Sequence, residues 1–220
     1  MHKSINNLNI IKEQILEEQK KLNNENKPPK IIAVSKTFSI EKIEPLLEFG
    51  HIHFGENKVQ EALNKWSNVK SHNQNIKLHL VGKLQTNKTK NAIKIFEYIH
   101  SLDSIKLAKE ISKEQKKINK KPKIFIQVNI GNEPQKSGIN KNEIFDFYKS
   151  CKEFDLDIIG LMCLPPINAD PDKFFSEMKF INDKLNLNEL SMGMSDDYLT
   201  ALKYSATFLR IGTKIFGKRN

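Results

Sequence analysis

The strongest constraint on this chain is a regular alternation of short apolar runs with segments of helical periodicity. Eight apolar runs predict β-strands, and a helical pattern follows nearly every one of them. Strands that alternate with helices form a parallel sheet. Eight such units in one chain predict a (β/α)8 barrel, the TIM-barrel architecture. The predicted strands cover residues 31–35, 52–54, 76–81, 98–100, 123–130, 157–163, 189–191 and 207–211.

The alternative architecture is an open, doubly wound parallel sheet. Its dinucleotide-binding form carries a glycine-rich turn after the first strand, and this chain has no such turn there. No linker, composition break or low-complexity tract interrupts the alternation, so we expect a single domain over residues 1–220. Residues 1–27 are expected to form a helix, over about 5–25, that packs on the barrel and ends before Pro28-Pro29.

Local signals predict several boundaries between elements. Asp170 followed by Pro171 is an N-cap with a proline at the first helical position. The segment Asn140–Glu143 resembles a capping box and predicts the start of another helix. Ser195 is predicted to cap a helix with acidic residues in its first turn, and the polar stretch 67–75 is predicted to be a loop.

The composition is that of a globular protein, with 38% hydrophobic and 28% charged residues. No run of about 18 apolar residues occurs, so we expect no membrane span. The N-terminus lacks the apolar core of a signal peptide. Cys151 and Cys163 have no metal-ligand spacing, and a reduced, cytoplasmic protein is the simplest interpretation.

The formal net charge of +10 admits two interpretations. One is binding of nucleic acid or another anion. The other is a lysine-rich composition spread over helix surfaces, and the chain favours this one because its lysines form only short clusters. We therefore expect no nucleic-acid partner. The predicted helices show no additional apolar stripe, so a monomer is expected.

Lys36 is the first candidate functional residue. It follows the buried run 31–35, so it should lie at the carboxyl end of a parallel strand, where α/β folds collect their active sites. A desolvated lysine amine can lose its proton and attack a carbonyl to form a Schiff base. Taken alone, Lys36 is more simply a solvated residue at a strand end.

The segments after the seventh and eighth strands are candidates for phosphate binding, because barrels often bind phosphate there. Ser191 lies in the first of these segments, Ser191–Gly193, and Gly212 and Thr213 lie in the second, Ile211–Thr213. Glycine allows close backbone approach, and hydroxyls and backbone N–H groups can donate to a phosphate. Arg210 ends the eighth strand, where a guanidinium needs a carboxylate partner or a ligand. Together with Lys36, these residues would suit a phosphorylated aldehyde whose ring nitrogen faces the arginine.

Other chemistry finds less support in the sequence. The six histidines form no zinc motif, and His51 and His53 are expected to be satisfied polar residues rather than metal ligands. The chain has no nucleophile-elbow, P-loop or papain-like signature. Cys163 is expected to be a small core residue.

Motifs along most of the chain resemble those of the pyridoxal phosphate homeostasis proteins, also called the YggS/PROSC family. They occur in the family's order and follow the first predicted helix. The matching segments are Ala33–Thr37, Phe54–Ala62, His79–Lys88, Gln127–Ile130, Lys136–Gly138, Gly160–Met162, Leu190–Asp197 and Arg210–Gly217. The loop 131–135 is less typical of the family, so the contacts of the wider loop 131–138 are left open.

The resemblance implies a barrel like the N-terminal domain of alanine racemase. It implies pyridoxal 5′-phosphate held as an internal aldimine on Lys36. By the same resemblance, a larger set of residues would surround the cofactor. Ser191, Gly212 and Thr213 would hold its phosphate, Arg210 would face its pyridine nitrogen, and Asn57 and Met162 would lie beside its ring.

The resemblance further implies a carrier that buffers the cofactor in vitamin B6 homeostasis, with little or no catalysis. An arginine opposite the pyridine nitrogen leaves that nitrogen unprotonated, which weakens the ring as an electron sink. We also expect no separate domain to supply a catalytic tyrosine, and Tyr98, Tyr148, Tyr198 and Tyr204 are expected to be structural. Apo-enzymes that use the cofactor are the expected partners. The alternative is a small amino-acid racemase-like enzyme in which Lys36 is catalytic.

Overall fold

The computed structural model describes residues 2–218. The predicted domain 1–220 therefore extends past the described residues at Met1 and at 219–220. Eight parallel strands close into a barrel because β4 pairs with β5 and β1 pairs with β9, which confirms the predicted architecture. These strands are β1 (Lys30–Val34), β2 (His53–Glu56), β3 (Lys77–Leu80), β4 (Tyr98–Leu102), β5 (Lys123–Asn129), β7 (Asp157–Cys163), β8 (Glu189–Ser191) and β9 (Phe208–Ile211).

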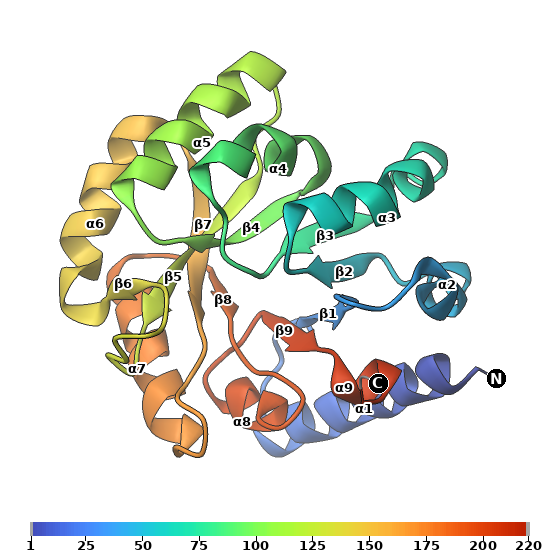
Figure 1. Cartoon of the computed structure of the whole chain (residues 1–220). Coiled ribbons are helices and arrows are strands. Elements are labelled where there is room, and N and C mark those ends of the chain that lie inside the picture. Colours follow the sequence, from blue (N-terminus) through green and yellow to red (C-terminus); the bar gives the residue numbers. More distant parts are fainter. Residues whose placement is uncertain (1, 219–220) are drawn as a thin grey trace.

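Helices surround the barrel, as Figure 1 shows. Their inward faces pack on the outer surface of the strands and form one large apolar core. The helices are α1 (Lys3–Lys21), α2 (Ile40–Glu48), α3 (Val59–His72), α4 (Thr89–Ile95), α5 (Ile105–Ile118), α6 (Ile144–Cys151), α7 (Pro171–Lys184), α8 (Tyr198–Lys203) and α9 (Thr213–Phe216). Short 3-10 turns lie at Thr86–Lys88, Lys141–Glu143 and Lys152–Phe154.

Helix α1 packs beside α8 and α9 (Figure 1). Its apolar face buries Leu8, Ile11 and Ile15, as the helical spacing predicted. Asn7 also donates a hydrogen bond to the Ile215 carbonyl oxygen at 2.9 Å, and the Tyr198 hydroxyl donates to Gln14. The first helix is therefore fastened to the last two, as expected for a helix that packs on the barrel.

Two local predictions differ from the structure, and one short strand was not predicted. Helix α3 continues to His72, because the polar residues predicted to form a loop lie on its solvent face. Ile139–Asn140 forms the short strand β6, which pairs with β5. Asn140 then caps the 3-10 turn that leads into α6, as the capping-box pattern predicted. Helix α8 has Asp197 rather than Ser195 at its N-cap position. Ser195 instead contacts Thr213, so its hydroxyl belongs to a different part of the molecule.

The N-cap predicted at Asp170 is present. Its carboxylate accepts a hydrogen bond from the Asp172 backbone N–H at 3.0 Å, and Pro171 is the first residue of α7. We expect Asp170→Ala to lower the free energy of unfolding by about 1 kcal/mol, measured by urea titration. Asp170→Asn keeps an oxygen acceptor and should retain most of the stability. Equal losses in the two variants would contradict the capping role.

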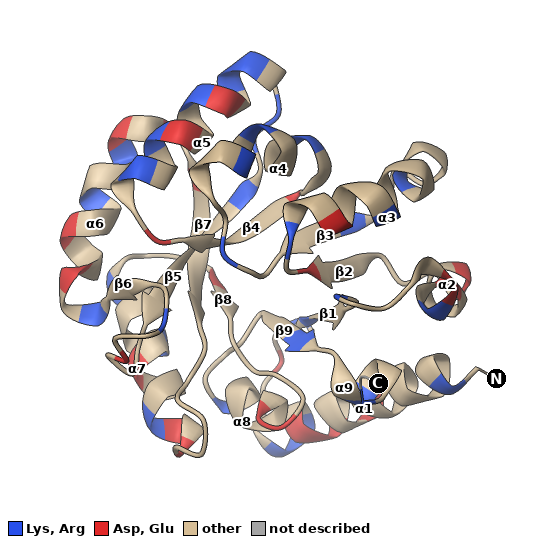
Figure 2. Ribbon diagram, in the orientation of Figure 1, with Lys and Arg blue, Asp and Glu red and all other residues tan. Residues whose placement is uncertain are grey.

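Basic and acidic residues alternate over the outer helices, as the blue and red segments of Figure 2 show. On α5, Lys113 pairs with Glu110 at 3.3 Å and Lys117 pairs with Glu114 at 2.6 Å. This distribution agrees with lysines spread over the helix surfaces. It does not form the single basic face that would favour nucleic-acid binding. No described helix combines the length and the apolar character that crossing a bilayer requires.

Candidate functional site

A pocket of about 430 Å³ opens at the carboxyl ends of the barrel strands. Residues from opposite ends of the chain meet there, because β1 and β9 are neighbours in the closed barrel. The pocket brings together five of the seven predicted site residues, which are Lys36, Asn57, Arg210, Gly212 and Thr213. Their roles toward a ligand remain predictions.

Lys36 lies on a tight turn directly after β1. Thr37 has a positive φ of 68°, and its backbone N–H donates to the Glu61 carboxylate on α3 at 2.7 Å. On the other side of Lys36, the Ser35 N–H donates to the Gly55 carbonyl oxygen at 2.9 Å. The backbone is thus held on both sides of Lys36, which is half-buried and lines the pocket.

The buried carboxylate of Glu56 holds the residue before this turn, Ser35, by a hydrogen bond. One of its oxygens accepts hydrogen bonds from Ser35 Oγ at 2.7 Å, from Lys65 Nζ at 3.0 Å and from Trp66 Nε1 at 3.0 Å. Burial raises the pKa of Glu56, while the Trp66 hydrogen bond and the Lys65 charge act in the opposite direction. Lys65 Nζ also donates to the Ser35 carbonyl oxygen at 3.0 Å, so α3 is fastened to the end of β1.

Arg210 forms part of the pocket floor, where its side chain is 5% exposed. Its Nη1 donates to Ser191 Oγ and its Nη2 donates to the Cys163 carbonyl oxygen, both at 2.7 Å. Burial lowers the pKa of Arg210. A guanidinium has five N–H donors, so these two bonds orient the group and leave donors available to a ligand.

Ser191 and Met162 do not line the pocket. Ser191 is fully buried and binds Arg210 and His100, and Met162 lies in the apolar cluster inside the barrel. The hydroxyl that reaches the pocket beside Thr213 is that of Ser195, at 2.9 Å from Thr213 Oγ1. The pair of Ser195 and Thr213 is therefore better placed for a phosphate than Ser191.

Sequence reasoning also missed two cations of the pocket, Lys83 and Lys136. Lys83 follows Gly82, where a Cβ atom would lie 2.3 Å from the Asn57 carbonyl oxygen, so glycine permits this close approach. Lys136 Nζ donates to the Pro165 carbonyl oxygen at 3.1 Å. With Lys36 and Arg210, these residues give the pocket four basic side chains against the single carboxylate of Asp196. This balance favours an anionic ligand.

The other residues considered in the sequence form hydrogen bonds or packing contacts within the protein. Residues 2–218 contain no group of three or more side chains that could hold a metal ion. His51 Nε2 lies 2.9 Å from the His53 carbonyl oxygen. The Tyr204 hydroxyl donates to Asp172 at 2.8 Å, and the Tyr98 ring stacks on His79. Cys163 is fully buried, and burial raises its pKa to about 12.

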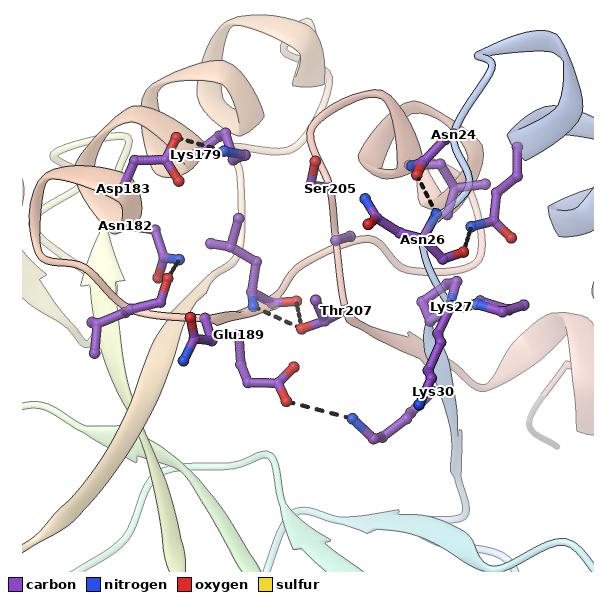
Figure 3. Close-up of a pocket in the computed structure, with 18 residues that line it drawn as sticks. Asn24, Asn26, Lys27, Lys30, Lys179, Asn182, Asp183, Glu189, Ser205 and Thr207 are labelled. Carbon is purple, nitrogen blue, oxygen red and sulfur yellow. Dashed lines mark hydrogen bonds and ion pairs between the residues drawn. The ribbon is translucent and has the colours of Figure 1, made fainter.

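A larger pocket, of about 510 Å³, opens at the opposite end of the barrel (Figure 3). Its walls include the segment between α1 and β1 and the residues that lead into β8 and β9. Several of its charged groups form ion pairs with one another. Lys30 pairs with Glu189 at 3.5 Å, and Lys179 pairs with Asp183 at 2.5 Å. The amino ends of barrel strands generally serve stability, so the smaller pocket is the candidate site.

Comparisons with known proteins agree on the kind of protein this chain is. The family model described as alanine racemase, N-terminal domain, matches residues 7–220. A curated protein of Haemophilus influenzae, the pyridoxal phosphate homeostasis protein, is 36% identical over 97% of this chain and 95% of its own length.

Solved structures extend the comparison. PipY of Synechococcus elongatus, with pyridoxal phosphate bound, superposes with a TM-score of 0.81 at 32% identity, over 92% of this chain and all of PipY. An alanine racemase of Clostridium difficile shares the fold, with a TM-score of 0.69 at 14% identity, over 93% of this chain and 56% of the racemase. The full-length matches at more than 30% identity show that this chain belongs to the family of pyridoxal phosphate homeostasis proteins.

Proposed function

We propose that this protein binds pyridoxal 5′-phosphate through Lys36 and serves intracellular homeostasis of that cofactor as a carrier. The observation that carries the proposal is the meeting of Lys36 with the buried guanidinium of Arg210 in one basic pocket. The pyridoxal phosphate held by PipY and the names of the curated relatives support the same ligand.

The residues present fit the cofactor. Its phosphate is a dianion, and the pocket supplies the hydroxyls of Ser195 and Thr213 and the backbone of Gly212 beside several lysines. A lysine amine condenses with an aldehyde by forming a C=N bond and releasing one water. Lys36 would supply that amine, and Asn57 would contact the ligand from the adjacent strand end.

Arg210 is the reason to propose a carrier ahead of a catalyst. When bound, pyridoxal phosphate supplies an electron sink for chemistry at amino acids, and this sink is strongest when its pyridine nitrogen is protonated. Arginine offers only N–H donors and does not release a proton under ordinary conditions. A buried arginine that faced this nitrogen would therefore favour storage of the cofactor over its use.

The test is an absorption spectrum of the purified protein with added pyridoxal phosphate, before and after borohydride reduction, followed by peptide mapping. We expect a visible band that reduction bleaches and a single phosphopyridoxyl adduct on Lys36. Lys36→Ala should fold and lose the adduct, whereas Lys58→Ala, at an exposed lysine outside this pocket, should retain it. No adduct, or one on another lysine, would overturn the assignment. Turnover of amino acids that depends on Lys36 would instead favour the racemase-like enzyme.

Two further features of the proposed carrier follow from its chemistry. We propose that the recipients of the cofactor are apo-enzymes that use pyridoxal phosphate, because an imine to lysine can be exchanged with another amine. We also propose that the carrier acts as a monomer, because the sequence shows no additional apolar stripe on the predicted helices. Size-exclusion chromatography with light scattering tests the second point, and a stable dimer would contradict it.

A further inference from the structure

A chain of hydrogen bonds runs through the interior of the barrel and ends at Arg210. His53 Nδ1 lies 2.9 Å from His79 Nε2, and His79 Nδ1 lies 2.9 Å from His100 Nε2. His100 Nδ1 in turn lies 2.9 Å from Ser191 Oγ, which accepts the hydrogen bond from Arg210 Nη1. We call these three histidines and Ser191 the histidine relay.

The strand register explains why residues so far apart in sequence meet. His53 is paired with Lys77, two residues before His79, and His79 is paired with Tyr98, two residues before His100. From each strand to the next, the histidine therefore lies two register positions closer to the carboxyl end of the barrel. Side chains two residues apart share a face of a strand, so all three histidines point into the barrel. The relay follows the stagger that barrel closure imposes.

Arg210 fixes the direction of every hydrogen bond in the relay. Its guanidinium can only donate, so Ser191 Oγ accepts from it. The single hydroxyl hydrogen of Ser191 is then available to His100 Nδ1, its only other hydrogen-bond partner within residues 2–218. His100 must therefore carry its hydrogen on Nε2 and donate to His79 Nδ1. By the same step His79 donates from Nε2 to His53 Nδ1.

The opposite direction would leave a buried group unsatisfied. If His100 carried its hydrogen on Nδ1, Ser191 Oγ would accept from both neighbours, and its own hydrogen would have no acceptor in the described structure. An unsatisfied buried donor costs about 1–3 kcal/mol. Burial also lowers the pKa of His79 and His100 well below the ordinary value, so both rings are neutral near neutral pH.

We infer that the histidine relay is a positioning device for Arg210, with all three histidines held in the Nε2–H tautomer. Ser191 Oγ can accept the hydrogen bond from Arg210 because its own hydroxyl hydrogen is donated to His100 Nδ1. The relay begins at His53, which is one of the residues that line a pocket of about 320 Å³ near the amino ends of β1 and β2. This inference concerns the protein alone and does not depend on the identity of the ligand.

Nitrogen-15 NMR of the labelled protein without added ligand tests the inference directly. Two-bond proton–nitrogen spectra distinguish the tautomers and the cation of each ring. We expect the Nε2–H pattern for His53, His79 and His100 at neutral pH. His72, whose Nδ1 lies 2.9 Å from the Asn68 carbonyl oxygen, should favour the opposite tautomer and serve as an internal reference. An Nδ1–H or cationic form of any relay histidine would overturn the inference.

Ser191→Ala tests whether Arg210 sets the direction. The variant removes the link between Arg210 and His100, so we expect His100 and His79 to become mixtures of both tautomers. Ser195→Ala is the matched control, because its hydroxyl contacts Thr213 and does not touch the relay. An unchanged Nε2–H pattern in Ser191→Ala would show that the direction has another source. If that variant does not fold, the spectra of the unaltered protein still decide the tautomers.

Discussion

Lowering the pH from 6.5 to about 4 is expected to remove much of the protein's stability. Burial lowers the pKa of His51 and His53 from 6.5 to about 4, with the charges of Lys30 and Lys77 adding to the effect at His53. Burial also lowers the pKa of His79 and His100 well below the ordinary value. The folded protein therefore keeps these four rings neutral in a pH range where the unfolded chain protonates them.

The direction of the effect follows from proton linkage. Above pH 6.5 neither state takes up a proton at these groups, and their contribution to stability is complete. As the pH falls below 6.5 the unfolded chain binds more protons, and each neutral histidine costs about 1.4 kcal/mol of stability per pH unit. For His51 and His53 together, two pH units correspond to a loss on the order of 5 kcal/mol, comparable with the total stability of a small domain.

Two carboxyl groups act in the opposite direction. Burial raises the pKa of Glu56 and of Asp103, so the folded protein takes up protons there before the unfolded chain does. That uptake stabilises the folded state as the pH falls and offsets part of the histidines' contribution. The four histidines outnumber the two carboxyl groups, so the net effect remains a loss.

Urea unfolding across this pH range measures the effect, with the fluorescence of the buried Trp66 as the signal. His53→Gln should flatten the dependence of stability on pH, because it removes one of the titrating rings. His72→Gln, which alters an exposed ring outside the histidine relay, is the matched control. Constant stability from pH 6.5 to about 4 would mean that the relay histidines are charged in the folded protein.

The alternation of strands and helices was enough to predict the barrel, because central parallel strands are buried on both faces. The strand at 157–163, for example, has the predicted bounds. Helix ends on the surface were harder to predict. Helix α3 continues through Asn68 and Ser71, which are typical of loops by composition but are exposed here and cost the helix little.

Some residues of the candidate site could also be predicted from the sequence, and others could not. Lys36, Asn57, Arg210, Gly212 and Thr213 could be placed from the sequence because each follows or ends a strand. Ser191 also ends a strand, but its side chain is turned into the barrel toward Arg210. The phase of so short a strand is not determined by its own sequence. Lys83 and Lys136 lie on loops whose course depends on the folded neighbours.

The histidine relay could not be predicted from spacing along the chain. His53, His79 and His100 are separated by whole βα units, and their contact depends on the stagger between adjacent strands. Barrel closure sets that stagger, and no single strand encodes it. A usable signal was that each of the three residues is a polar side chain within an otherwise apolar run.

Lys65→Met is expected to be among the most destabilising single substitutions outside the barrel interior. Glu56 is fully buried, and Lys65 Nζ lies 3.0 Å from its Oε1 with only 10% of the lysine side chain exposed. Removal of one partner from a buried ion pair leaves an uncompensated charge, which costs about 3–5 kcal/mol. Urea unfolding at neutral pH should show a loss of this size.

Lys21→Met is the matched control, because Lys21 pairs with Glu18 at 3.5 Å while 70% of its side chain is exposed. An exposed pair contributes about 0–1 kcal/mol, so this variant should unfold almost as the unaltered protein does. The double variant with Glu56→Gln and Lys65→Met removes both charges and keeps an oxygen acceptor for Ser35 and Trp66. It should recover a large part of the stability that Lys65→Met loses.

The pH dependence of the Lys65→Met loss separates charge from packing. Without Lys65 the pKa of Glu56 should rise further, since the lysine charge opposes the effect of burial. The folded variant then gains a proton before the unfolded chain does, so its deficit relative to the unaltered protein should narrow as the pH falls. A deficit that is constant with pH would assign the loss to packing of the lysine stem. A narrowing deficit would show that α3 holds the turn at Lys36 through the ion pair, so disruption of that pair should also weaken ligand binding at Lys36.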